Sequence, residues 1–434
     1  MLYDSEESED DENSVSSILS EVSLIRGIME NNPYRTHIEW DGNSNYIQRY
    51  IQNMSDEDWE QLGRDISNNI HLHEISLYLG VLNDRTMSSL FRGLTGSRSI
   101  EELHLFRNEL SVAGVGSMVP FLQSANNLFN LNLDGNNIQS EGFNELFRAF
   151  RDSPIEQLRC CGCGIGSIEI DIENIPRQLK LLDLNGNFIN ADGCRVLSKL
   201  LQWGDATLER LDLRGNYIDD ESVEILVNAL QSNTSLTILN LSKNDGISSH
   251  GIIMLLKLVN NISSIKATLQ SNHTLKNIYL KGDNVIEYHI ARALESNRAY
   301  EGDPERAGKD KIINFQIDSS RRAALAELQG VRQSLYSEIN PLHLPEVFAS
   351  VGRYLDEGEL YIALKSSIEE VMSTVNRKQC LQQQMAYHKA KIAEHRASLE
   401  AAKVELAAIE TEEVHDSTSI WSESPRSNKK LRAL

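Results

Sequence analysis

The stretch Leu208–Ser235, LERLDLRGNYIDDESVEILVNALQSNTS, decides the fold of this chain. From Leu208 to Ile218 its apolar residues and one asparagine follow the spacing L-x-x-L-x-L-x-x-N-x-L, with isoleucine in the last place. An amphipathic run from Ser222 to Gln231 comes next. The closely spaced leucines predict a short buried strand and the run predicts a helix, so the stretch is one strand-and-helix unit.

The same spacing recurs along most of the chain. Successive units begin 27 to 29 residues apart in most cases, with intervals of 24 residues after Ile155 and 39 residues after Leu236. A period of this length is typical of a solenoid, in which each unit buries its apolar face against its neighbours. The units begin at Leu72, Ile100, Leu128, Ile155, Leu179, Leu208, Leu236 and Leu275.

Stacked units of this kind predict an α/β solenoid with a parallel sheet on its concave side and helices on its convex side. The ninth position of each unit turns the chain away from the sheet, and a buried amide there can donate to and accept from the backbone. We therefore expect a ladder of stacked side chains. Gly80 and Asp283 occupy the ninth position in the first and last repeats, so the ladder is expected to be less regular there. The predicted ladder residues are Asn108, Asn136, Cys163, Asn187, Asn216 and Asn244.

Two of the units, LERLDLRGNYIDDES and LKLLDLNGNFINADG, resemble those of ribonuclease-inhibitor-type leucine-rich repeat proteins. The resemblance covers Leu72 to Asn297, roughly half of the chain. It implies a horseshoe with a concave parallel sheet. It does not imply one function, because the same scaffold serves inhibitors, innate receptors, cytoskeletal regulators and GTPase-activating proteins.

The segments that flank the repeats are expected to cap the array or to extend from it. A capping box that opens at Ser55 predicts a helix in a degenerate first repeat. Apolar residues at alternating four- and three-residue steps from Leu381 to Ile409 predict a coiled coil, in which His388 and His395 weaken the seam and are candidate pH sensors. The expected organisation is an acidic disordered tail (1–13), an N-terminal capping helix and degenerate repeat (14–71), the leucine-rich repeats (72–299), a C-terminal helical cap (311–375), a coiled-coil helix (376–413) and a disordered tail (414–434).

Four segments depart from the regular pattern. Ile165–Arg177 lacks helical periodicity, so an extended convex segment is expected there. Ser263–His273 is additional to its repeat and predicts either a prolonged helix or a protruding loop. Tyr300–Lys311 is polar and contains glycine and proline, which indicates a linker, and Lys311–Ile317 predicts a last extended segment.

Composition restricts the compartment and the partners. The formal net charge is −21, which disfavours nucleic acid and anionic membrane surfaces. No apolar run is long enough to span a bilayer, and the acidic N-terminus does not have the form of a signal peptide. Five cysteines, an odd number, suit reduced thiols. The expected location is the cytoplasm, with the nucleus as the alternative.

The concave surface is the predicted binding site for a protein partner. The residues between the leucines point outward there, and they include aromatic and arginine side chains, which dominate protein interfaces. The surface carries both signs of charge. The candidate contact residues are Tyr78, His104, Phe106, Arg107, Arg159, Arg210, Asp212, Arg214 and Tyr279.

The sequence contains no motif that predicts catalysis, a cofactor or a metal site. The phosphate-binding loop, the G-x-S-x-G turn and a recognisable catalytic triad are all missing from it. Cys160, Cys161 and Cys163 are close in sequence, but the repeat places one in the core, one on the concave surface and one in the ladder. Their sulfurs should therefore diverge, and no second pair has zinc spacing.

These features predict a non-enzymatic scaffold that holds a protein on its concave face. The C-terminal helix would add weak self-association or join the chain to an assembly. The alternative is regulation of a small GTPase, because the Ran GTPase-activating family shares this repeat class and carries an acidic run. Here the acidic run precedes the repeats, and no activating residue can be placed.

Overall fold

The computed structural model describes residues 28, 30–150, 153–171, 175–203, 207–281 and 285–317, together with 389, 391, 393 and 396–404. The chain divides into two compact units, Met1–Tyr336 and Ser337–Leu434. The repeats lie in the first unit. In the second unit the described residues are helical, and Leu399, a predicted seam residue, is 57% exposed. The predicted acidic tail, nearly all of the predicted N-terminal capping helix and the final tail lie outside the described residues. So do most of the predicted C-terminal cap and most of the predicted coiled-coil helix, including His388 and His395.

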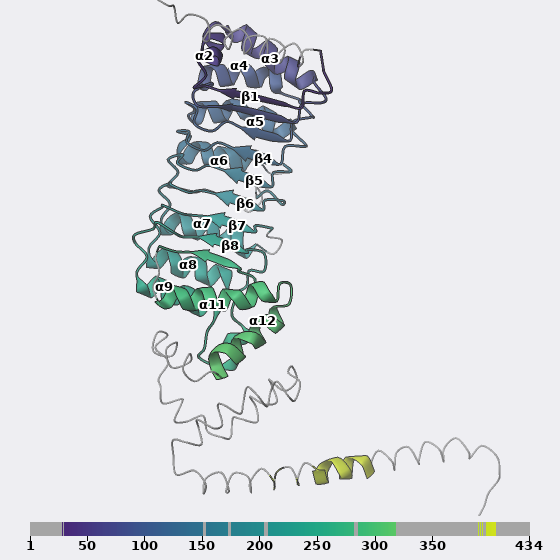
Figure 1. The fold of residues 1–434 in the computed structure, drawn as a ribbon, viewed down its shortest axis with the longest axis vertical. Helices are drawn as coiled ribbons and strands as arrows, with labels where there is room; N and C mark the ends of the chain where they lie inside the picture. The colour runs from purple at the N-terminus through teal and green to yellow at the C-terminus, as the bar shows by residue number, and fades with distance from the viewer. Residues whose placement is uncertain are drawn as a thin grey trace, which may run out of the picture. The chain divides into compact units, whose positions relative to one another are not determined.

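The first unit contains a nine-stranded parallel sheet in which every strand pairs with the next strand in sequence. Each repeat adds one strand in the same register, so that Leu211, for example, is aligned with Leu182 on one side and with Leu239 on the other. Figure 1 shows the strands stacked along the array. The strands are β1 His37–Asp41, β2 Glu74–Tyr78, β3 Glu102–His104, β4 Asn130–Asn132, β5 Gln157–Arg159, β6 Leu181–Asp183, β7 Arg210–Asp212, β8 Ile238–Asn240 and β9 Asn277–Tyr279.

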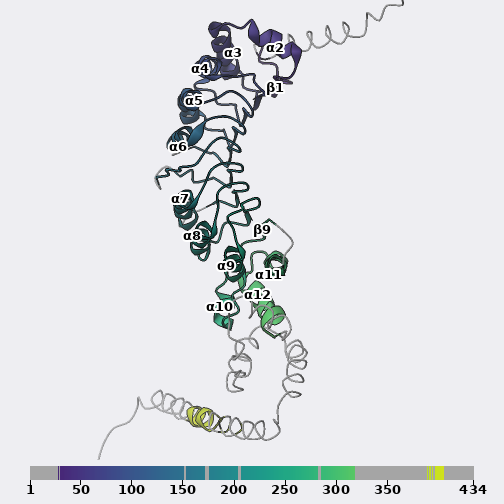
Figure 2. The same cartoon turned by 90° about the vertical axis from the view of Figure 1, so that its left-hand side faces the viewer.

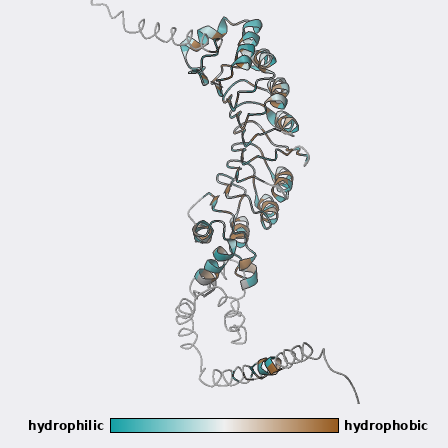
Figure 3. Cartoon of the chain, turned by 90° about the vertical axis from the view of Figure 1, so that its right-hand side faces the viewer, coloured by the Kyte–Doolittle hydropathy of each residue, from teal (hydrophilic) through white to brown (hydrophobic). Residues whose placement is uncertain are grey.

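Helices cover one face of this sheet (Figure 2). They carry both hydrophobic and hydrophilic residues (Figure 3), as expected of helices that cover a core on one side. The arrangement is an α/β leucine-rich-repeat solenoid. The helices are α2 Asn45–Gln52, α3 Asp56–Asn68, α4 Asp84–Leu94, α5 Val112–Ser124, α6 Gln139–Ala149, α7 Ala191–Gln202, α8 Asp220–Leu230, α9 Ser249–Val259, α10 Ile265–Leu269, α11 Val285–Ala299 and α12 Pro304–Lys311, which continues as a π-helix over Ile312–Ile317.

The core is built from the leucines of the motif. Leu131 and Leu133 of one repeat are fully buried, as are Leu211 and Leu213 of another. Each fills the same slot as its counterpart in the neighbouring repeat, so the apolar layer is continuous along the array. Because each repeat buries its apolar face against its neighbours, a single repeat is not expected to be stable alone.

The ninth-position asparagines form hydrogen bonds from one repeat to the next. The Asn136 amide donates to the carbonyls of Leu105 and Leu133, at 2.8 Å in both cases, and its oxygen accepts from the backbone N–H of Asn108 at 3.1 Å. Asn244 repeats the pattern. Cys163 substitutes in part, because its thiol reaches the Leu133 carbonyl at 3.2 Å. Asp283 lies outside the described residues.

The N-terminal end carries an imperfect repeat. β1 pairs with β2, and Ser55 forms the expected capping box with Asp58 at the start of α3. Ile28 is buried, and its carbonyl accepts a hydrogen bond from the Asn69 side chain at 3.0 Å. Ile28 is therefore attached to the first repeats through Asn69. The remainder of the predicted capping helix lies outside the described residues.

The segment between β5 and β6 contains no helix among its described residues, as predicted. Ile168 and Ile170 alternate with exposed residues and are 4% and 9% exposed. The Asn144 side chain on α6 accepts a hydrogen bond from the Glu169 backbone at 2.9 Å. An extended segment thus packs on the convex side where the other repeats have a helix.

Three predictions for the C-terminal part of the array are wrong. The additional residues of the 39-residue unit form a separate short helix, α10, rather than a prolonged helix or a loop. The predicted linker is helical from Pro304 onward, and the predicted last extended segment is a π-helix. Pro304 occupies the first turn of α12, where proline is favourable, and Asp303 caps that turn. Lys311 and Ala307 are buried, so tertiary packing holds this helix.

A buried basic pair joins α12 to the repeats. Lys311 is fully buried, and its ammonium donates to the carbonyls of Val259 at 2.7 Å and Asn272 at 3.3 Å. It also lies 3.0 Å from Nδ1 of His273, whose Nε2 lies 3.2 Å from the Leu269 carbonyl. Burial lowers the pKa of Lys311 to about 7. Below that pH its ammonium can only donate, so Nδ1 of His273 accepts and the neutral histidine carries its proton on Nε2. Burial, and then the charge of Lys311, lower the pKa of His273 to about 4.

This histidine is expected to make the array sensitive to mild acid. The folded state binds fewer protons than the unfolded state between pH 6.5 and 4, so stability falls as pH falls through this window. About 2 kcal/mol should be lost by pH 5. Urea denaturation at several pH values measures the slope. His273→Gln should flatten it, while His37→Gln, at an exposed site, should leave it unchanged; a slope that survives H273Q would contradict this assignment.

Candidate functional site

The sheet face opposite the helices, here called the concave face, displays the residues between the motif leucines. These are the third, fifth and seventh positions of each repeat, and β1 adds a further row. The fold does not require particular residue types at these positions, because they point away from the core. The side chains at these positions can therefore contact a protein partner.

An aromatic pair stands at the N-terminal end of the concave face. The rings of Tyr78 and Phe106, on neighbouring repeats, are stacked with centroids 4.6 Å apart and an interplanar angle of 9°. The Tyr78 hydroxyl donates to the Glu39 carboxylate at 2.6 Å. This hydrogen bond, followed by burial, raises the pKa of Tyr78 to about 12. The pair is thus a rigid, partly exposed platform beside a carboxylate.

Carboxylates occur on the concave face from β1 to β7, whereas most of its basic side chains lie on and after β7. Arg159 stands near the middle, on β5. Lys281, at the C-terminal end, is ion-paired with Asp245 at 2.5 Å. The carboxylates of β1 to β3 are Glu39, Asp41, Glu74 and Glu102, and the bases on and after β7 to β9 are Arg210, Arg214, Lys243 and Lys281.

The centre of the face holds a partly buried thiol between carboxylates. The Asp134 side chain accepts from the Cys161 backbone at 2.6 Å. Burial, and then Asp183 and Asp134, raise the pKa of the Cys161 thiol well above its usual range. Burial also raises the pKa of Asp183. Cys161 is therefore a protonated thiol at neutral pH, which is a poor nucleophile.

The expectation that the three sulfurs diverge is wrong for Cys160 and Cys163, whose thiols interact; after burial, this contact raises the pKa of Cys160. Cys160 is buried in the core and Cys163 is buried in the ladder, whereas Cys161 is partly exposed. Within the described residues, no group of three or more histidine, cysteine, aspartate or glutamate side chains is placed to hold a metal ion.

Most of the predicted contact residues are accessible but do not form one cluster. His104 lies beside Glu102 at 3.4 Å near the aromatic pair. Arg107 is exposed on the adjoining turn with a φ of +53°. Arg210 and Arg214 lie far along the array, and Tyr279, 48% exposed, is on the last strand.

The structure contradicts the prediction that Asp212 contacts a partner. The side chain is on the concave face, but it is only 5% exposed. Its carboxylate accepts from the Asn240 amide at 2.8 Å and from the Arg214 backbone at 3.1 Å, and it lies 3.6 Å from Arg210. Asp212 therefore orients its neighbours rather than offering a contact of its own. The repeat pattern could not show this, because it predicts on which face of the sheet a side chain lies but not which neighbouring residues cover it.

A second aromatic pair was missed by the sequence patterns. Phe188 and Tyr217 are stacked with centroids 5.8 Å apart and are 52% and 65% exposed. Each directly follows a ladder asparagine, at a position that the motif leaves free. Aromatic residues at this position in two successive repeats are the signal that could have found the pair, since equivalent positions in adjacent repeats lie side by side.

The fold and the concave face define a leucine-rich-repeat solenoid protein. The family model described as a leucine rich repeat matches residues 204–226 and 232–256. No curated protein matched the chain. Among solved structures, the chain is similar to one titled "Leiomodin-1 Actin-Binding Site 2 (ABS2)", at 15% identity over 31% of this chain and 75% of that chain, with a TM-score of 0.26. None of the helices in the described part of the chain is long and apolar enough to cross a membrane.

Proposed function

We propose that this protein is a non-enzymatic interaction scaffold that holds a protein partner on its concave face. The main support for this proposal is the stacked pair of Tyr78 and Phe106 beside Glu39. Aromatic side chains that are held rigid lose little conformational entropy on binding, and the apolar core does not need them at these positions.

The distribution of charge defines the kind of partner that would fit. The N-terminal strands present carboxylates around the aromatic platform, so a lysine or arginine side chain of the partner would be attracted there. The C-terminal strands present arginine and lysine side chains, which would attract an acidic segment. The partner surface is thus expected to be dipolar along the array. Regulation of a small GTPase stays a prediction, and a GTP hydrolysis assay with candidate GTPases tests it.

Paired substitutions test the concave face. Tagged full-length protein captures its partner from cell extract, and the partner is then purified and its affinity measured. Phe106→Ala combined with Arg214→Ala should weaken binding at least tenfold, because it removes one anchor from each end of the face. The unfolding midpoint should change little, since both side chains lie outside the core.

The matched control replaces the same residue types away from the concave face. Phe188→Ala combined with Arg148→Ala removes an exposed aromatic residue and an exposed arginine of α6. This variant should bind normally. Loss of binding in the control, with retention in F106A/R214A, would place the partner on the Phe188 side and contradict the proposal.

A further inference from the structure

The last strand of the sheet leaves part of the core uncovered. Ile278 and Leu280 of this repeat fill the two slots that leucines fill elsewhere, and their counterparts Leu239 and Leu241 are 0% and 1% exposed. Ile278 and Leu280 are only partly buried. No tenth strand follows among the described residues, so α11 alone stands beyond them.

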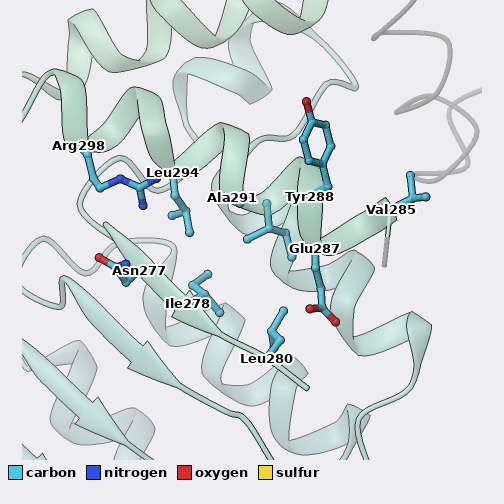
Figure 4. A pocket seen from close by; sticks show the side chains of 10 residues that line it. Asn277, Ile278, Leu280, Val285, Glu287, Tyr288, Ala291, Leu294 and Arg298 are labelled. Atoms are coloured by element: carbon cyan, nitrogen blue, oxygen red, sulfur yellow. The ribbon is translucent and has the colours of Figure 1, made fainter. Parts of the chain in front are cut away.

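A groove lies between β9 and α11 (Figure 4). It has a volume of about 620 Å³. Ile278 and Leu280 line it from the strand, and Ala291 and Leu294 line it from the helix. Tyr288, which is 60% exposed, stands on the rim. The groove has the position that the strand of a next repeat would occupy.

The backbone of β9 offers hydrogen bonds on this side. In a parallel strand, alternate residues bond to the neighbours on the two sides. The Asn277 N–H donates to Thr237, and the Tyr279 carbonyl accepts from Leu241 at 2.8 Å, so both bond to the β8 side. The N–H and C=O of Ile278 and the N–H of Leu280 therefore face the groove.

Charges mark the two ends of the groove. Arg298 stands beside Asn277 at one end, and Glu287 stands beside Leu280 at the other (Figure 4). Arg298 also donates to the Lys276 carbonyl at 2.6 Å, which is the first acceptor on the open side of β9. A strand that ran parallel to β9 would meet the arginine at its N-terminal end and the glutamate at its C-terminal end.

We propose that the groove binds an extended segment of a partner protein, which adds to β9 as a tenth parallel strand. The segment would carry two apolar residues separated by one residue, to cover Ile278 and Leu280. It would carry an acidic residue on its N-terminal side and a basic residue on its C-terminal side. Backbone hydrogen bonds would supply affinity, and the two apolar side chains would supply specificity.

This site is separate from the concave face, and its test does not depend on the partner proposed there. A suitable probe is a capped synthetic peptide with the sequence of Thr207–Gly215, TLERLDLRG, which has the required order of acidic, apolar and basic residues. Calorimetry with the full-length chain should detect binding. Hydrogen–deuterium exchange should slow over 278–280. A control peptide with serine in place of Leu211 and Leu213 should bind at least tenfold more weakly.

One substitution should block the groove without disturbing the fold. Ala291 is an exposed helix residue that lines the groove, so Ala291→Arg fills the space while keeping a good helix former. It should weaken peptide binding at least tenfold with an unchanged unfolding midpoint. Ala299→Arg makes the same change at an exposed residue of α11 outside the groove lining, and it should bind like wild type.

Three outcomes would overturn the proposal. The first is no binding with up to about 1 mM peptide, together with unchanged exchange over 278–280. The second is equal binding by wild type and A291R. The third is a full-length chain that self-associates and becomes monomeric on A291R substitution, because the occupant would then be a second copy of this chain rather than another protein.

Discussion

Replacing Asn136 with alanine is expected to destabilise the array by on the order of 1–3 kcal/mol. Asn136 is 3% exposed, and its amide makes hydrogen bonds to the backbone of its own repeat and of the preceding one. Alanine would remove the acceptor of the Asn108 and Leu110 N–H groups, at a cost of about 1–3 kcal/mol for an unsatisfied buried group. The Leu105 and Leu133 carbonyls would each keep a second donor, the Asn108 amide and the Cys163 thiol. Urea denaturation of the full-length chain measures the change in the free energy of unfolding.

The neighbouring residue supplies the control for this prediction. Asn137 is exposed, and its side chain accepts a hydrogen bond from Gln139, another exposed residue. Asn137→Ala should therefore change the free energy of unfolding by less than about 0.5 kcal/mol. Equal midpoints for N136A and N137A would show that the ladder does not hold the repeats together.

Replacing Gly63 with alanine is expected to have an effect of similar size, for a different reason. α3 and α4 approach backbone to backbone, and a Cβ atom at Gly63 would lie 2.2 Å from the Leu90 carbonyl oxygen. Gly93 on α4 is equally restricted, since its Cβ would lie 2.1 Å from the Glu60 carbonyl oxygen. Backbone atoms cannot move aside as a flexible side chain can, so Gly63→Ala should cost about 3 kcal/mol.

A glycine in the next helix should respond with the opposite sign. Gly116 lies within α5, and a Cβ atom there would come no closer than 3.5 Å to the Glu145 carboxylate, an ordinary contact. Gly116→Ala should therefore stabilise the protein by about 0.5–1 kcal/mol, because alanine loses less backbone entropy in a helix. The same denaturation experiment compares the two variants. Destabilisation by both, or by neither, would refute the close approach of α3 and α4.

The candidate site could be predicted only in part from the sequence. Tyr78 and Phe106 occupy outward positions of adjacent repeats, so their place on one face follows from the period. Their stacking and the hydrogen bond to Glu39 depend on side-chain conformations that the period does not specify. Asp212 shows the same limit, because Asn240 of the next repeat and Arg214 of its own cover a side chain that the pattern places outward.

The C-terminal end shows where local patterns failed. Pro304 and the surrounding polar residues indicated a linker, yet Asp303 and Pro304 begin a helix whose inner side packs on the repeats. Lys311 would not be expected in a core from its residue type. It is buried because three acceptors, the carbonyls of Val259 and Asn272 and Nδ1 of His273, converge on its ammonium.

The repeating part of this protein follows from local sequence patterns: the period, the strand of each unit, the leucine core and the positions of the ladder asparagines. It does so because every repeat has the same neighbours, and the same local pattern therefore has the same tertiary meaning each time. Where that regularity ends, the outcome depends on packing between elements that are distant in the sequence. The groove beside β9, the buried Lys311 and the exposed Phe188–Tyr217 pair depend on contacts between different elements, and no local spacing encodes those contacts.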